Sequence, residues 1–239
     1  MIHKVFDIHS HIVPGVDDGS LNTEMSIQML RHAYDQGVRS IVCTSHDTCE
    51  MNSYIESFNN LREQSSVENI DINLYHGCEI YCDDYIVKDI INELDNGNLL
   101  TINDTKCVLV EFNPYETADI ILNCIKSISM AGYTPILAHT ERHYGLSMEP
   151  QYIGSLKQYG CLFQVNAYSM VEESDKIIKD FAQKLLKEKL ITFIGSDAHR
   201  SNRRPYMIDS GVDYIYKYCY AEYAKDICYR NAQRILNLN

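Results

Sequence analysis

Seven short apolar runs recur along this chain, and helical segments separate them. This alternation limits the fold more than any other feature. The runs are rich in valine and isoleucine and show little alternation with polar residues, which is typical of strands buried on both faces of a sheet. They are Val5–Ile8, Ser40–Thr44, Ile72–Cys78, Cys107–Val110, Thr134–Ala138, Cys161–Val165 and Ile191–Ile194.

The segments between the runs carry apolar residues at helical spacing. The first begins at Asn22, a residue that often caps a helix, and ends before Gly37. The predicted helices are Asn22–Gln36, Tyr54–Val67, Asp84–Leu94, Ala118–Met130, Pro150–Gln158, Ser174–Lys189 and Ala221–Leu236. Successive βα units predict an α/β fold, a parallel barrel that can be incomplete. We find no linker or repeat, so we expect residues 1–239 to form one domain.

The composition argues against several classes of partner. With 21 basic and 33 acidic residues the formal net charge is −12, which disfavours nucleic acid and anionic lipid. No apolar run reaches the roughly 18 residues of a membrane span, and the amino terminus lacks a secretory signal, so we expect a cytoplasmic protein. The nine cysteines include no Cys-x-x-Cys pair, and we expect reduced, mostly buried thiols.

Side chains that can bind metal lie where the predicted strands end. His9 and His11 follow the first run two residues apart, so they share one face of an extended chain. The carboxyl ends of the strands in a parallel barrel meet on one rim, where active sites lie. A turn after His11 brings Asp17 and Asp18 back toward the imidazoles. At the ends of later strands the sequence has His46, Glu79, Glu111, His139, Asp197 and His199.

This set of ligands restricts the chemistry. Imidazoles and carboxylates without cysteine suit zinc, manganese or iron. The residues are too many for one tetrahedral ion, so we predict two or three divalent ions that share bridging carboxylates. Closely spaced ions activate water and hold the oxygens of a transferred phosphoryl group. We therefore predict hydrolysis of a phosphoester as the first choice of reaction, with hydrolysis of an amide or another C–N bond as the second choice.

Arginines follow two of these strand ends, and guanidinium groups bind phosphate oxygens in bidentate fashion. We predict this role for Arg142 and Arg204, and less so for Arg200 and Arg203. His143 is a weaker candidate for contact with substrate. The spacing Cys-x5-Arg of cysteine phosphatases also occurs near the carboxyl terminus, but there it lacks glycine and lies in a helical pattern, so we exclude that mechanism.

Short motifs then identify a family. DIHSHIVPGVDDG, TSH, CEI, EF, AHTER and SDAH occur in the order typical of the PHP (polymerase and histidinol phosphatase) superfamily. The VDDG sequence, the Ala-His-x-Glu-Arg motif and the closing Asn-Ala-x-x-Ile-Leu resemble one branch of it. That branch is the bacterial manganese-dependent tyrosine-protein phosphatases of capsular and exopolysaccharide operons, the CpsB and YwqE type. The resemblance extends from residue 4 to about residue 236.

The resemblance implies a distorted seven-stranded (β/α) barrel with three metal ions, most readily Mn²⁺, with iron or zinc as alternatives. The motifs assign the first ion to His9, His11, Glu79 and Asp197. Glu79 would bridge to a second ion, held also by Glu111 and His139. The third ion would be held by Asp18, His46 and His199, although the sequence barely separates Asp18 from Asp17.

The resemblance also implies a substrate. Arg142 and Arg204 match the substrate-side arginines of the family, whose substrates are phosphotyrosines in the tail of a bacterial tyrosine autokinase that controls polysaccharide export. We therefore expect a metal-dependent protein-tyrosine phosphatase that works by attack of a metal-bound hydroxide on phosphorus. The alternatives are a phosphoesterase for a small molecule such as histidinol phosphate, and a regulatory metal-binding barrel without turnover. The sequence leaves open the oligomeric state, the kinase and the role of the tyrosine-rich segment 214–223.

Overall fold

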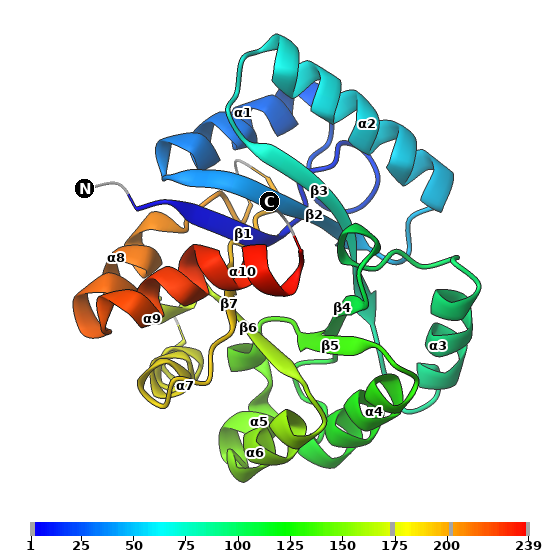
Figure 1. The fold of residues 1–239 in the computed structure, drawn as a ribbon, viewed down its shortest axis with the longest axis vertical. Coiled ribbons are helices and arrows are strands. Elements are labelled where there is room, and N and C mark those ends of the chain that lie inside the picture. Colours follow the sequence, from blue (N-terminus) through cyan, green and yellow to red (C-terminus); the bar gives the residue numbers. More distant parts are fainter. Residues whose placement is uncertain (1–2, 173–174, 201–202, 238–239) are drawn as a thin grey trace.

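The computed structural model describes residues 3–172, 175–200 and 203–237. Seven strands form one parallel sheet in the order of the sequence, and helices cover its outer face (Figure 1). The predicted α/β barrel of seven strands is therefore confirmed. The strands are β1 (Val5–Ser10), β2 (Val38–His46), β3 (Asn73–Tyr81), β4 (Cys107–Glu111), β5 (Thr134–Leu137), β6 (Leu162–Asn166) and β7 (Phe193–Gly195).

The first and last strands bring the sheet close to a full barrel. Just beyond the end of β7, the backbone N–H of Asp197 donates to the carbonyl of His9 at 2.8 Å, and the N–H of His11 donates to the carbonyl of Ala198 at 2.9 Å. The pairing between β5 and β6 is short, with two paired positions. The barrel is thus distorted, as expected, and the β1–β7 closure lies at the carboxyl ends of the strands, where the predicted site residues are.

Six of the seven predicted helices are present, with ends shifted by a few residues, whereas the helices at Tyr144–Met148 and Asp209–Tyr218 were not among those predicted. Asn22 caps the first helix, because its side chain accepts a hydrogen bond from the backbone N–H of Met25 at 3.0 Å. The helix predicted from Ser174 begins at Lys176 in the structure, and Ser174 itself lies outside the described residues. The helices up to β7 are α1 (Thr23–Asp35), α2 (Met51–Val67), α3 (Val87–Asp95), α4 (Ala118–Met130), α5 (Tyr144–Met148), α6 (Gln151–Gln158) and α7 (Lys176–Lys187).

After β7 the chain forms α8 (Asp209–Tyr218) and then three short helices in succession. These are α9 (Ala221–Lys225), the π-helical turn η4 (Asp226–Arg230) and α10 (Asn231–Ile235), where the sequence predicted one continuous helix. Single-turn 3-10 helices lie next to three of the strands. η1 (Ile102–Asp104) precedes β4, η2 (Thr140–Arg142) follows β5, and η3 (Ala167–Met170) follows β6.

An apolar cluster fills the barrel beneath the site. Phe6, Leu109 and Phe193 belong to it and come from strands on opposite sides of the barrel, so their side chains meet in the interior. Ala232 and Leu236, from the end of the chain, join the same cluster. The carboxyl-terminal helices therefore close the amino-terminal end of the barrel, which leaves the opposite rim for polar residues.

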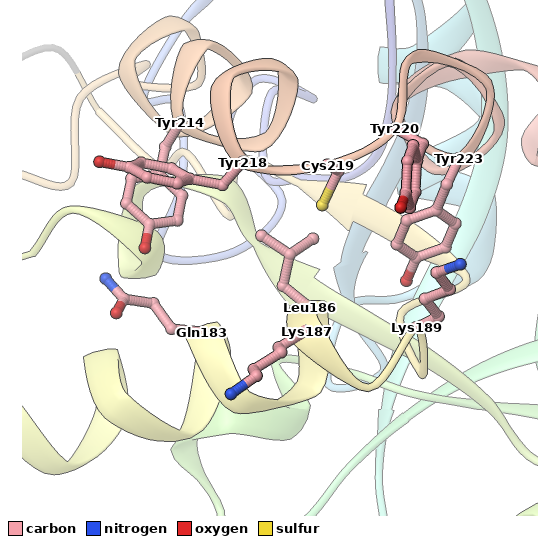
Figure 2. Close-up of a pocket in the computed structure, with 9 residues that line it drawn as sticks. All are labelled: Gln183, Leu186, Lys187, Lys189, Tyr214, Tyr218, Cys219, Tyr220 and Tyr223. Carbon is pink, nitrogen blue, oxygen red and sulfur yellow. The ribbon is translucent and has the colours of Figure 1, made fainter.

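The tyrosine-rich segment forms α8, a short connection and the start of α9. Tyr214, Tyr218, Tyr220 and Tyr223 line a cavity of about 360 Å³ together with residues at the end of α7. Figure 2 shows these side chains around it. Tyr218 and Tyr220 are exposed, whereas the other two are half-buried, so this segment is largely a packed helix face and its connection. The nine cysteines are free thiols, seven of them buried, as predicted. Among the described residues, no helix has the length and apolar character to cross a membrane.

Gly211 provides a test of the packing of α8 against η3. A Cβ atom at this position would lie 1.9 Å from the carbonyl oxygen of Ala167, which is backbone and cannot swing away. We expect Gly211→Ala to lower the free energy of unfolding by about 1–3 kcal/mol, as overpacking does. Gly154→Ala on α6 is the matched control, because its Cβ would meet nothing within 4 Å. It should be neutral or stabilising in urea denaturation, and equal stabilities of the two variants would contradict this packing.

Candidate metal centre

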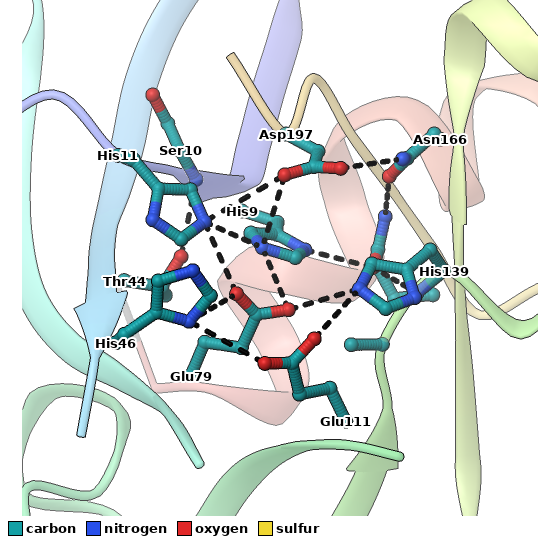
Figure 3. Close-up of polar contacts among 12 residues, drawn as sticks. His9, Ser10, His11, Thr44, His46, Glu79, Glu111, His139, Asn166 and Asp197 are labelled. Atoms are coloured by element: carbon teal, nitrogen blue, oxygen red, sulfur yellow. Dashed lines mark hydrogen bonds and ion pairs between the residues drawn. The ribbon is translucent and has the colours of Figure 1, made fainter. Parts of the chain in front are cut away.

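The nine residues predicted as metal ligands converge on the carboxyl-terminal rim of the barrel, and Figure 3 shows seven of them. They come from the ends of six strands or the loops after them, all except β6, so the fold rather than local sequence brings them together. Among the described residues, atoms within 4.8 Å of one another form four groups. The groups are His11, Asp18, His46 and His199; His9, Glu79 and His139; His9, His11 and Asp197; and His46, Glu79 and Glu111.

Glu79 lies at the centre of this cluster and is buried. Its Oε1 is 2.9 Å from Nε2 of His139 and 3.2 Å from Nε2 of His9. Its Oε2 is 3.1 Å from Nε2 of His11 and 3.3 Å from Nδ1 of His46. The two oxygens therefore face different pairs of imidazoles, which is the arrangement of a carboxylate that bridges two cations.

Glu111 and Asp197 extend the cluster on opposite sides of Glu79. Glu111 Oε1 lies 3.4 Å from Nδ1 of His46, and Oε2 lies 3.6 Å from Nε2 of His139. Asp197 Oδ1 lies between 3.5 and 3.7 Å from three imidazole nitrogens, those of His9, His11 and His199. These separations exceed hydrogen-bond length, and they leave space between ligand atoms that all point inward.

Asp18 and His199 meet at the outer edge of the cluster. Asp18 Oδ1 is 3.2 Å from Nε2 of His199 and 3.6 Å from Nε2 of His46. Both Asp18 Oδ1 and His199 Nε2 are buried atoms, and neither has a hydrogen-bond partner in the part of the chain that the structure describes. Buried polar atoms normally find a partner. A cation held between these two atoms would supply it, and imidazole with carboxylate is a suitable set of donors.

The two neighbouring aspartates have different roles. Asp17 points away from the centre, and its Oδ2 lies 2.8 Å from Nδ1 of His11 while its Oδ1 accepts from the backbone N–H of Gly19. A carboxylate on the far nitrogen of a ligand imidazole orients the ring. The structure thus places Asp18 toward the cluster and Asp17 behind His11, a distinction that the sequence left open.

Mutual charge stabilises the cluster. Burial would raise the pKa of Glu79, but the imidazoles around it, His9 above all, hold that pKa well below its usual value. Burial likewise opposes ionisation of Glu111, yet His139 and His46 lower its pKa to about 2. Burial would lower the pKa values of His11 and His139, but their carboxylate partners raise each to about 10. Without metal, protons therefore occupy these rings, and a divalent ion would displace them.

The two arginines predicted on the substrate side both reach Asp197. Nη1 of Arg142 donates to Oδ2 at 2.5 Å, and Nη1 of Arg204 lies 3.2 Å from Oδ1. A cavity of about 270 Å³ opens beside these three residues, with Tyr168 and Met207 also in its lining. The side chains of Arg142 and Arg204 are 31% and 39% exposed, so an anion in the cavity can reach both guanidinium groups.

The other candidates have structural positions. Nε of Arg200 donates to the carbonyls of Asp18 and Gly19 at 2.9 Å each, which fixes the loop that carries Asp18. Arg203 is exposed and pairs with Arg200 through the backbone. The suggestion that His143 contacts substrate is wrong: this side chain is fully buried behind the rim, and burial lowers its pKa to about 3.

Sequence reasoning missed the residues behind the ligands. Gln164 and Asn166 lie on β6, both buried, and hydrogen-bond to His9 and Asp197 respectively. Glu141 lies behind Asn166, where its Oε1 accepts from the Asn166 backbone N–H at 3.2 Å. The available signal was a polar residue inside an apolar strand, because a glutamine between Phe163 and Val165 needs a partner within the barrel.

Comparisons with known proteins identify a matching family and similar sequences. The family model described as "Capsular polysaccharide synthesis, CpsB/CapC" matches residues 5–237. The tyrosine-protein phosphatase CpsB of Streptococcus pneumoniae is 32% identical over 97% of this chain and 98% of its own length. The tyrosine-protein phosphatase YwqE of Bacillus subtilis strain 168 is 31% identical over 84% of this chain and 79% of its own length.

Solved structures show the same fold. A chain from the crystal structures of Bacillus subtilis YwqE and Streptococcus pneumoniae CpsB, described as unique metal-dependent tyrosine phosphatases, superposes with a TM-score of 0.88. It is 27% identical and covers 98% of this chain and 95% of its own. Histidinol phosphate phosphatase of Lactococcus lactis shares the fold, with a TM-score of 0.60 and 14% identity over 90% of this chain and 93% of its own.

Proposed function

This chain belongs to the CpsB/CapC family of capsular polysaccharide synthesis proteins, and we propose that it is a metal-dependent protein-tyrosine phosphatase. The observation that carries the proposal is the cluster of nine imidazole and carboxylate residues on one rim, beside a cavity with two accessible arginines. The CpsB and YwqE relatives are named tyrosine-protein phosphatases, and their structures are described as those of metal-dependent enzymes.

The ligand residues fit a cluster of three divalent ions, and Mn²⁺ is our first choice over iron and zinc. We assign the first ion to His9, His11, Glu79 and Asp197, the second to Glu79, Glu111 and His139, and the third to Asp18, His46 and His199. The unsatisfied Asp18 Oδ1 and His199 Nε2 and the two-sided contacts of Glu79 support this assignment. Bound divalent ions supply an acidic water and neutralise charge on a phosphoryl group.

The residues of the cavity account for recognition of the substrate. Arg142 and Arg204 would bind the phosphate oxygens and orient the phosphorus toward the cluster, which lies directly behind Asp197. Tyr168 and Met207 line the same cavity and would pack against the phenyl ring. The departing phenolate has a pKa of about 10, so it needs less help from a proton donor than an alkoxide would.

The proposal extends to the cellular substrate. The family description concerns capsular polysaccharide synthesis, which supports a phosphotyrosine tail of a bacterial tyrosine kinase that controls polysaccharide export. Such a tail would lie in the cytoplasm, so we place this enzyme there as well. We further propose that residues 1–239 act as one phosphatase domain, since the family match spans residues 5–237.

Turnover of two substrates tests this function. With Mn²⁺ present, kcat/KM for a tyrosine-phosphorylated peptide should exceed that for histidinol phosphate by at least about 100-fold, a discrimination that pocket contacts commonly supply. The same peptide with phosphoserine is the matched control, because it keeps the phosphate and removes the aryl leaving group. Faster turnover of histidinol phosphate would indicate a small-molecule phosphoesterase, and no turnover of any phosphoester by metal-loaded protein would indicate a regulatory barrel.

A further inference from the structure

Gln164 is a buried amide on β6 that makes hydrogen bonds in three directions. Its Oε1 accepts from the backbone N–H of His139 at 2.7 Å. A backbone N–H can only donate, so this contact determines which end of the amide is oxygen. Nε2 must then lie at the other end, where it donates to Oδ1 of Asn166 at 2.9 Å. The orientation of the Gln164 amide is therefore determined by one backbone group.

The same oxygen determines the state of His9. Nδ1 of His9 lies 3.1 Å from Gln164 Oε1, and an amide oxygen can only accept, so Nδ1 carries the hydrogen. In the neutral ring Nε2 then has a free lone pair. This nitrogen lies 3.2 Å from Glu79 Oε1 and 3.2 Å from Nε2 of His11, at the centre of the cluster. Gln164 thus turns Nε2 of His9 toward the other residues of the cluster, where it could coordinate a metal ion.

The other end of the amide acts on Asp197 through Asn166. Because Asn166 Oδ1 accepts from Gln164, its Nδ2 points the other way and donates to Asp197 Oδ2 at 3.1 Å. This hydrogen bond occupies the outer oxygen of Asp197. Arg142 also donates to Oδ2, and Oδ1 faces Nε2 of His9 and Nε2 of His11, at 3.7 and 3.6 Å, while it accepts from Arg204 at 3.2 Å. Figure 3 shows Asn166 beside Asp197, on the side of the carboxylate away from Glu79.

Two backbone features show that the surrounding structure is built around this side chain. A Cβ atom on Gly195 would lie 2.7 Å from Gln164 Nε2 and 2.7 Å from the Cβ of His9, so glycine at this place in β7 leaves room for both. His139 has a φ of 29°, in the region that side chains other than glycine disfavour. Such a conformation persists only where neighbouring contacts hold it, and the hydrogen bond from its N–H to Gln164 is one of them.

We propose that Gln164 is a positioning residue for the metal centre: its single amide presents Nε2 of His9 and Oδ1 of Asp197 to the ions and holds the backbone of His139. The inference rests on the proposed function, because it requires that the cluster bind metal. Asp17 orients His11 from a separate loop, so the two outer contacts act on different ligands.

Three variants test this role. Gln164→Met keeps the length of the side chain and removes both polar ends, whereas Gln164→Glu keeps an acceptor for His9 and His139 and loses the donor to Asn166. Gln36→Met is the matched control. Gln36 also uses both ends of its amide, since Nε2 donates to the carbonyl of Tyr206 at 2.8 Å and Oε1 accepts from the N–H of Ile208 at 2.8 Å.

The readouts are the affinity of metal-free protein for Mn²⁺, by electron paramagnetic resonance titration, and the melting temperature of the same samples without metal. We expect Gln164→Met to weaken Mn²⁺ binding about 10–100-fold, as loss of such outer contacts does elsewhere. Gln164→Glu should recover part of that affinity. Gln36→Met should lower the melting temperature and leave the affinity at the wild-type value, which separates positioning from general stability.

Wild-type affinity in folded Gln164→Met would overturn the inference, and so would equal losses of affinity in Gln164→Met and Gln36→Met. If Gln164→Met does not fold, Gln164→Glu decides, because it must still bind Mn²⁺ more weakly than Gln36→Met; equal affinity would refute the role. Failure of wild-type protein to bind Mn²⁺, Zn²⁺ or Fe²⁺ would overturn the proposed function and this inference together. If wild-type protein binds Mn²⁺ tightly and the Gln164 variants bind it with the same affinity, the inference is refuted but the proposed function is not.

Discussion

Glu79→Gln is expected to lower kcat/KM for a tyrosine-phosphorylated peptide by about 10³-fold or more. The amide keeps the shape of the side chain and removes the charge that faces four imidazoles, those of His9, His11, His46 and His139. Metal ions in such sites supply several kcal/mol of charge stabilisation in the transition state, and about 1.4 kcal/mol corresponds to a factor of ten. Loss of a bridging ligand should remove at least one ion and most of that stabilisation.

Steady-state kinetics with saturating Mn²⁺ and metal analysis of the purified variant measure this effect. Glu63→Gln is the control, because Glu63 is exposed on α2 and carries the same change of charge. It should retain both the wild-type rate and the wild-type metal content. A Glu79→Gln protein that kept full metal content and a rate within tenfold of wild type would rule out the central position assigned to this carboxylate.

Removal of divalent ions with a chelator is expected to abolish turnover, and added Mn²⁺ should restore it. The same addition should raise the melting temperature in a concentration-dependent way, because a ligand of the native state stabilises by about 2.7 kcal/mol at one hundred times its dissociation constant. Mg²⁺ should restore little activity, since it prefers oxygen ligands and this cluster offers five imidazoles.

The measurement requires metal analysis of the chelated protein alongside the rate, so that incomplete stripping is not mistaken for activity without metal. Far-ultraviolet circular dichroism of the stripped sample checks that the barrel remains folded. Undiminished turnover in protein shown to contain no divalent ion would disprove the metal-dependent mechanism. Loss of activity that no metal reverses, in protein that remains folded, would equally count against it.

Much of the fold could be predicted because its signals are local. A strand buried on both faces reads as a short apolar run, and a helix between two such strands shows its own period, so seven strands and six helices could be placed within a few residues. For example, the strand predicted at Cys107–Val110 is β4, which ends one residue later, at Glu111. The carboxyl-terminal helix was predicted less well, because the π-helical turn of η4 interrupts it without a proline or glycine.

The ligands could also be predicted from local signals, because each lies at or just after the end of an apolar run and parallel strands place all such ends on one rim. The sequence does not show, however, which of two neighbouring polar residues faces the cluster. Asp17 and Asp18 are adjacent and chemically alike, yet one orients His11 and the other faces His199. Similarly, His143 follows Arg142 directly but lies buried beneath the rim. Neither difference has a counterpart in spacing or composition.

By itself the sequence determined the order of the elements, the barrel class and the side chains that gather at its mouth, because periodicity and strand polarity depend on nearby residues. The tertiary structure alone decided which atom of each side chain faces inward. His9 and Gln164 are separated by 155 positions, and their hydrogen bond depends on the closure of the whole barrel. Hydrogen bonds are directional and short, so their partners are known only once distant strands have been placed side by side.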